Sequence, residues 1–196
     1  MTRSKKQNSY FDAGCKPEEQ IPRSFSVSFY EVGNGIREEV RVVLNDDEQI
    51  GDVINDNAYS NDFYRYHDIF HYTFATLLGW SPCTRAMMKR KRKSDVLLDE
   101  IEDGARATIT EEALSMVIFN EAKRKKYFEG ASKVSRTTLR IVKEMTENFE
   151  VNARTSKEWE KAILKAYDMF RLLINNGGGR VNFNLLTKEI DYLAIN

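Results

Sequence analysis

Hydrophobic and polar residues alternate in two short stretches near the start of the chain. Phenylalanine and valine alternate with serine in residues 24–32, and valine alternates with charged residues in residues 38–45. A period of two is typical of a strand with one buried face. The Gly-Asn-Gly sequence at 33–35 between them is a turn signal. The pattern therefore predicts a β-hairpin within residues 21–50.

The middle of the chain changes to a spacing of three and four, which predicts helices. A first helix begins near Asp62 and ends at Gly79, where glycine suits the left-handed conformation that closes a helix. A short helix starts at Pro82, a residue favoured in the first helical turn. A longer helix runs from Ser94 to about Tyr127 and is apolar on two sides, which is typical of a central helix in a bundle.

The last third of the chain predicts two more helices and an extended tail. One helix spans about 136–150. The next begins at the capping-box pair Thr155 and Glu158 and stops at the Asn-Asn-Gly-Gly-Gly sequence of residues 175–179. The tail alternates weakly and reads as a strand that joins the hairpin.

These elements predict a mainly α protein, a helical bundle with an N-terminal β-hairpin and a C-terminal strand packed beside it. The 196 residues suffice for one compact domain with its own core. Its predicted parts are a flexible lead-in at 1–20, the hairpin at 21–50, a helical catalytic bundle at 51–175 and the C-terminal tail at 176–196.

The composition limits the kinds of binding partner and the cellular compartment that we expect for this protein. Thirty basic residues balance thirty acidic ones, so no overall positive charge attracts nucleic acid or a membrane. No apolar run approaches the roughly 20 residues that cross a bilayer, and no apolar stretch follows the basic N-terminus as in a signal peptide. Two cysteines do not form a disulfide framework. We therefore expect a cytoplasmic protein.

The only two histidines, His67 and His71, lie one turn apart on the first predicted helix. An i, i+4 pair of histidines is a good metal-ligand spacing, and Asp68 beside them adds a carboxylate. The alternative is that both histidines lie at the edge of the core and bond to water or backbone carbonyls. The acidic helix that follows favours the metal interpretation.

Glu100 and Asp103 share one face of the predicted helix at 94–127, and Glu112 falls among apolar neighbours. Carboxylate oxygens suit Mg²⁺, and also Mn²⁺. A solvated acidic face is the ordinary alternative. Glu112 either binds the metal or pairs with Arg106 or with an arginine of another helix.

The basic run at 89–93 lies just before these acids. Arg90, Arg92 or Lys93 could hold phosphate oxygens, with arginine giving two parallel hydrogen bonds, and Arg106 is a further phosphate-binding candidate. A solubilising surface patch explains the same run equally well.

The order Asp68-x-x-His71 and then Glu100-x-x-Asp103 resembles the MazG-like all-α NTP pyrophosphohydrolases. These enzymes carry Glu-x-x-Glu on one helix and Glu-x-x-Asp on the next. The second half matches, and the first half departs, since aspartate and histidine stand where two glutamates are expected. The resemblance covers about residues 50–125.

The resemblance implies an enzyme that cleaves a nucleoside triphosphate to a monophosphate and pyrophosphate. It implies that Asp68, His71, Glu100 and Asp103 hold the cations. Glu112 is a further candidate ligand because of its position among apolar neighbours and not because of the resemblance. Glu100, Asp103 and His67 are the residues to which we assign catalysis. A homodimer or homotetramer is implied as well.

Two other interpretations stay open. The altered first motif favours a non-enzymatic module that senses nucleotide or binds a protein on the same helical fold. A phosphohydrolase of the His-Asp type is the weaker option, because that group needs a further histidine upstream, and both histidines here lie on one helix.

Overall fold

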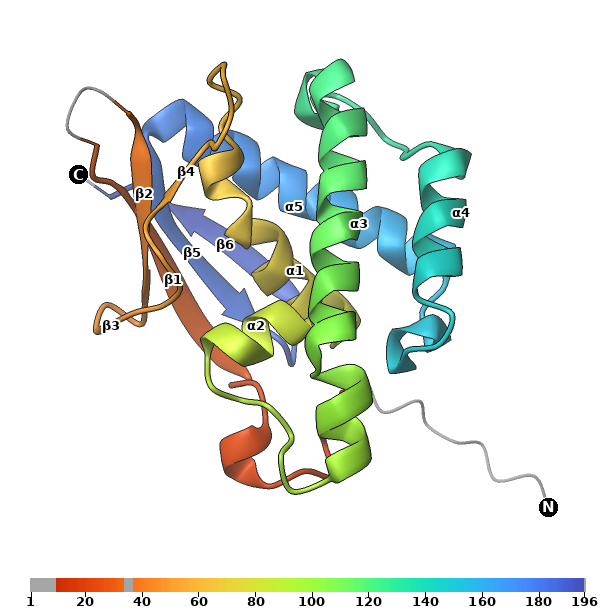
Figure 1. The fold of residues 1–196 in the computed structure, drawn as a ribbon. Helices are drawn as coiled ribbons and strands as arrows, with labels where there is room; N and C mark the ends of the chain where they lie inside the picture. The colour runs from red at the N-terminus through yellow and green to blue at the C-terminus, as the bar shows by residue number, and fades with distance from the viewer. Residues whose placement is uncertain (1–9, 34–36, 196) are drawn as a thin grey trace.

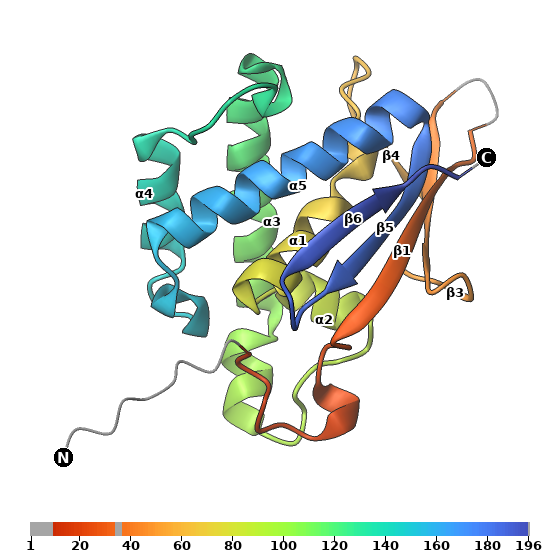
Figure 2. The same cartoon turned by 180° about the vertical axis from the view of Figure 1, so that it is seen from behind.

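The computed structural model describes residues 10–33 and 37–195, and it shows a mixed α/β protein. One antiparallel sheet is covered on one side by helices in two layers (Figures 1 and 2). The predicted mainly α bundle is therefore wrong. The sheet is built by β1 (Ser24–Glu31), β2 (Glu39–Leu44), β3 (Glu48–Gln49), β4 (Ile54–Asn55), β5 (Gly178–Asn184) and β6 (Glu189–Leu193).

The strand order β3-β2-β1-β5-β6 puts β1 at the centre of the sheet, and β4 pairs with β2. β1 pairs antiparallel with β2, as the alternating pattern predicts, so that Val27 lies opposite Leu44. On its other edge, β1 pairs with β5, and Val27 lies opposite Val181. The turn predicted at 33–35 falls largely outside the described residues. Both ends of the chain thus build one sheet, which makes strand pairing a main part of the fold.

Glycines make the connection between α5 and β5 possible. Gly177 closes α5 with a φ of 62°. Gly178 has a φ of 115°, and a Cβ atom there would lie 2.3 Å from the carbonyl oxygen of Phe29 on β1. Only glycine allows this conformation and this close approach together. The chain can therefore leave the helix and enter the sheet at once.

The helices of the described residues are α1 (Asp68–Leu78), α2 (Pro82–Met87), α3 (Ala105–Arg124), α4 (Arg136–Met145) and α5 (Ser156–Asn176). Gly79 ends α1 in the left-handed conformation, as predicted. Thr155 and Glu158 form the predicted capping box of α5. The start of the first helix was predicted too early, because Phe63 adopts a φ of 64° and a 3₁₀ turn, Tyr64–Tyr66, precedes α1.

The predicted long helix from 94 to 127 is two elements. A π-helical turn, Leu98–Glu102, is separated from α3 by Gly104. A Cβ atom on Gly104 would lie 2.1 Å from the carbonyl oxygen of Glu100, so only glycine fits at this break between the two elements. The break separates the acids on its two sides, which has consequences for the predicted site.

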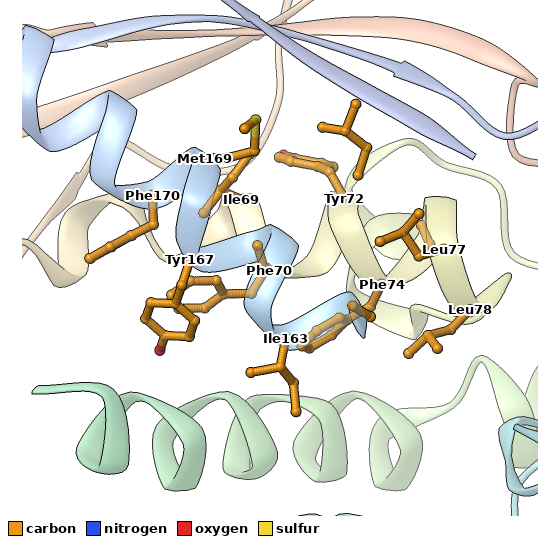
Figure 3. Packing of buried hydrophobic residues seen from close by; sticks show 14 of the residues in the cluster. Ile69, Phe70, Tyr72, Phe74, Leu77, Leu78, Ile163, Tyr167, Met169 and Phe170 are labelled. Carbon is orange, nitrogen blue, oxygen red and sulfur yellow. The ribbon is translucent and has the colours of Figure 1, made fainter. Parts of the chain in front are cut away.

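Helices α1 and α5 form the inner layer, between the sheet and α3 (Figure 3). Every residue of α1 is buried. The ring of Phe70 on α1 lies 4.7 Å from that of Tyr167 and 5.4 Å from that of Phe170, both on α5. The core thus joins α1 and α5, which pack against the sheet on one side and against α3 on the other.

No helix in the described part of the chain has the length and apolar character needed to cross a membrane.

Candidate metal centre

A buried pair, His71 on α1 and Glu111 on α3, is the centre of the site. His71 Nδ1 lies 2.9 Å from Glu111 Oε1, and both side chains are inaccessible to solvent. Glu111 also accepts hydrogen bonds from the Ser81 hydroxyl at 2.7 Å and from the Cys83 backbone N–H at 2.9 Å. The start of α2 therefore fixes the carboxylate, which in turn fixes the imidazole ring.

The other ring nitrogen of His71 has no hydrogen bond although it is buried. Nε2 faces Glu112 Oε1 at 3.3 Å, within the range of an ion pair. The Cys83 thiol donates to the same oxygen of Glu112 at 3.5 Å. An imidazole whose Nδ1–H is held by a carboxylate can bind a metal through Nε2 once the ion displaces the Nε2 proton, which is the usual arrangement of a histidine that binds a metal.

His67, one turn before His71, is oriented in the same way. Its Nδ1 lies 3.0 Å from the backbone carbonyl oxygen of Tyr64, so that nitrogen donates and Nε2 is left as the acceptor. The ring stacks on that of Tyr64 with 4.2 Å between centroids. Asp68 Oδ1 lies 3.4 Å from His67 Nε2. Both histidines therefore have Nδ1 held by an oxygen atom and Nε2 directed at a carboxylate.

Two groups of ligand atoms come together among the described residues, each within 4.8 Å. One group is His67, His71 and Glu112, and the other is His71, Cys83 and Glu111. Two imidazoles and one carboxylate suit divalent zinc, manganese or iron. This arrangement can hold one such ion between α1 and α3.

The charges of the site are strongly coupled. Burial lowers the pKa of His71, but Cys83 and the Glu111 carboxylate outweigh it and hold the pKa well above its usual range. Burial raises the pKa of Glu112, but the contact with His71 dominates and lowers that pKa to about 2. Burial lowers the pKa of His67. A divalent cation would replace the proton that His71 holds between two carboxylates.

The family model of the MazG C-terminal domain matches residues 6–196. The chain belongs to this family. The match is not to the catalytic MazG NTP pyrophosphohydrolase domain, so the resemblance seen in the sequence is right about MazG and wrong about which of its domains this is. No curated protein and no solved structure matches the chain.

In this MazG C-terminal domain, two of the predicted site residues bind each other. Asp103 is fully buried and accepts from Arg92 through three hydrogen bonds, at 2.7 Å, 3.0 Å and 2.7 Å. Arg85 Nε lies 3.6 Å from Asp103, and Glu150 binds the far side of the Arg92 guanidinium. A carboxylate and a guanidinium satisfied in this way stabilise the fold around the π-helical turn.

The remaining predicted residues lie apart from the centre or at its edge. Three of them are exposed, namely Lys93, Glu100 and Arg106. The fourth, Arg90, donates to the carbonyl oxygen of Glu18 at 2.9 Å.

Neither ligand group of the described residues includes Asp68, Glu100 or Asp103. Glu112 pairs with His71, not with Arg106.

The structure thus joins the histidines of α1 to Glu111 and Glu112. The sequence did not lead us to assign Glu111, Ser81 or Cys83 to the site. Glu111 carried a signal, because it occupies a buried stripe of α3 at helical spacing with Ala107, Leu114 and Ile118. An acid in such a stripe needs a partner.

Proposed function

We propose that this domain hydrolyses nucleoside triphosphates with the help of a divalent metal held by His67, His71 and Glu112. The observation that supports this proposal most directly is that one ligand atom from each of these three residues lies within 4.8 Å of the other two. Three protein ligands with room for water are typical of catalytic, not structural, zinc sites. The Glu112 side chain is 43% exposed, so a substrate can approach from that side.

The reaction proposed is that of MazG enzymes, giving a nucleoside monophosphate and pyrophosphate. A bound ion would lower the pKa of a water molecule and offset the charge that develops on the phosphates. The residues of the chain orient the ligands: Glu111 holds His71, and the Tyr64 carbonyl holds His67. Both imidazoles are fixed before metal binds, which reduces the reorganisation that binding requires.

The ligand types change the expected cofactor. A site of four carboxylates favours Mg²⁺, whereas two imidazoles favour Mn²⁺ or Zn²⁺. We therefore propose Mn²⁺ or Zn²⁺ as the activating ion and expect Mg²⁺ to support less turnover.

The test is pyrophosphate release from a panel of ribo- and deoxynucleoside triphosphates with each of the three metals. His71→Gln should lower the rate at least about 100-fold, because loss of a ligand is expected to exceed the 10–100-fold effect of an outer-shell change. Glu100→Gln is the matched control, since that side chain is exposed and outside the centre. Equal rates in wild type and His71→Gln would contradict the assignment.

A second candidate function is binding of nucleotide without turnover. The observation that favours it is that neither ligand group of the described residues includes Glu100 or Asp103, the two acids that match the catalytic MazG pattern. Equilibrium dialysis with a nucleotide and metal separates the two. Metal-dependent binding without any product would support this candidate over hydrolysis.

A further inference from the structure

A cleft of about 620 Å³ between α5 and β6 plays no part in the function proposed above (Figure 2). It is lined mainly by one face of α5, by the start of β6 and by the turn that precedes β6. Small-molecule sites usually have volumes of about 300–1,000 Å³. Neither ligand group of the metal centre contributes a residue to the cleft, so a molecule bound here is separate from the metal.

Four lysines line the cleft. Lys157, Lys161 and Lys165 occupy every fourth position of α5, so they share one face of the helix and follow one another about 6 Å apart along its axis. Lys188 comes from the turn before β6. Within the described residues, none of the three α5 side chains has an ion-pair or hydrogen-bond partner. Three ammonium groups are therefore free to bind an anion.

Two acids of α5 also line the cleft, and each is already engaged. Asp168 forms an ion pair with Arg171. Glu160 accepts a hydrogen bond from the Val134 backbone N–H at 3.0 Å. These contacts hold both carboxylates on other groups, so they do not neutralise the lysines.

Strand β6 gives the cleft an apolar side. Ile190 is 2% exposed, whereas Glu189 and Asp191 on either side of it are exposed. Since side chains alternate between the two faces of a strand, these acids point away from the helices that Ile190 faces. Leu77 of α1 and Leu164 of α5 add further apolar surface. The cleft therefore combines an apolar side with free cations.

Lys188 shows that positive charge accumulates here. Its Nζ donates to the Leu77 carbonyl oxygen at 3.3 Å. Burial lowers the pKa of Lys188, and the charges of Arg154 and Lys161 lower it too, against the opposite effect of Glu158. A bound anion would offset this repulsion between cations.

We propose that this cleft binds a small organic phosphate, with the phosphate on the lysines and the rest of the molecule against Leu164 and Ile190. Lysine binds phosphate as a point charge. A phosphate monoester brings close to two negative charges and three acceptor oxygens, which suits several ammonium groups better than the single charge of a carboxylate. The inference does not depend on the metal centre of the proposed function.

The first test is labelling of the full chain with one equivalent of pyridoxal 5′-phosphate, a chelator being present to remove metal. The aldehyde of this organic phosphate forms an imine with a neutral lysine amine, and borohydride fixes it. Mass spectrometry should find Lys188 labelled at least about tenfold more than Lys126, which is exposed and does not line the cleft. Excess inorganic phosphate should suppress the label. Even labelling of the exposed lysines would overturn the proposal.

The second test measures the affinity for pyridoxine 5′-phosphate, which lacks the aldehyde, by calorimetry. Lys161→Gln should weaken binding about tenfold, the size expected for loss of one contact to a charged group. Lys161 is exposed, so the variant keeps the fold. Lys126→Gln removes the same charge outside the cleft and should bind like wild type. Equal weakening in both variants, or equal affinity for pyridoxine without its phosphate, would overturn the proposal.

Discussion

Glu111 is the residue on which the geometry of the centre depends. It accepts hydrogen bonds from elements that are far apart in sequence, through Ser81, Cys83 and His71. Since all three donors are directed at a single carboxylate, the imidazole can adopt only one orientation. The identity of a ligand such as His71 could be predicted from its type and spacing. The contacts that orient His71, from Glu111 and the two donors that hold Glu111, could not be predicted, because these residues meet only through tertiary packing.

A substitution of Asp103 tests whether this buried acid stabilises the fold or binds the metal. Asp103→Asn leaves the Arg92 guanidinium buried with only part of its countercharge, so we expect a loss of about 3 kcal/mol in the free energy of unfolding. Urea unfolding measures this change. Affinity for Zn²⁺ should stay unchanged. Unaltered stability together with weakened metal binding would mean that Asp103 is a ligand and that the ion pair with Arg92 matters little.

At the scale of elements, Glu121 joins the end of α3 to the start of α4. It accepts from the Ser135 backbone and hydroxyl, both at 3.0 Å, and from the Thr138 hydroxyl. Burial raises the pKa of Glu121, but hydrogen bonds from Lys125, Thr138 and Ser135 outweigh it, so the pKa lies below 4.5. The folded state therefore binds this proton more weakly than the unfolded state. The resulting stabilisation is present above pH 4.5 and is lost as the pH falls through the folded-state pKa.

Glu121→Gln should remove that contribution. The difference in unfolding free energy between wild type and variant should be largest above pH 4.5 and should shrink below it. Urea unfolding at several pH values, with a chelator present to exclude metal, gives this difference directly. A difference that stays constant across the range would show that the carboxylate charge of Glu121 does not link the two helices.

Local signals predicted the element boundaries that depend on neighbouring residues. The capping box at Thr155 and the glycine end of α1 at Gly79 are examples. Gly104 is a weak point of the predicted helix at 94–127, but the pattern does not predict a break there, because a single glycine inside a helical pattern does not by itself end a helix. That break separates Glu100 from the face of α3 that reaches the histidines.

At the scale of the whole molecule, the sheet is formed by strands from both ends of the chain. The pairing of β1 with β5 joins Ser24 to Asn184, and no local pattern encodes a contact of that separation. The hairpin could be predicted because its strands are adjacent in sequence. The fold class could not, since the tail alternates weakly and its partner lies far away in the chain. The helices consequently pack on a sheet and not only on one another (Figure 1).

The measurement that tests the account most directly is the metal content of the purified chain after saturation with Zn²⁺ and removal of free ion. We expect one zinc per chain in wild type and in Glu100→Gln, and less than a tenth of that in His71→Gln, because the buried Nε2 is central to the ligand group. Circular dichroism confirms that the variants are folded. One zinc per folded chain in His71→Gln, or none in wild type, would contradict a metal centre between α1 and α3.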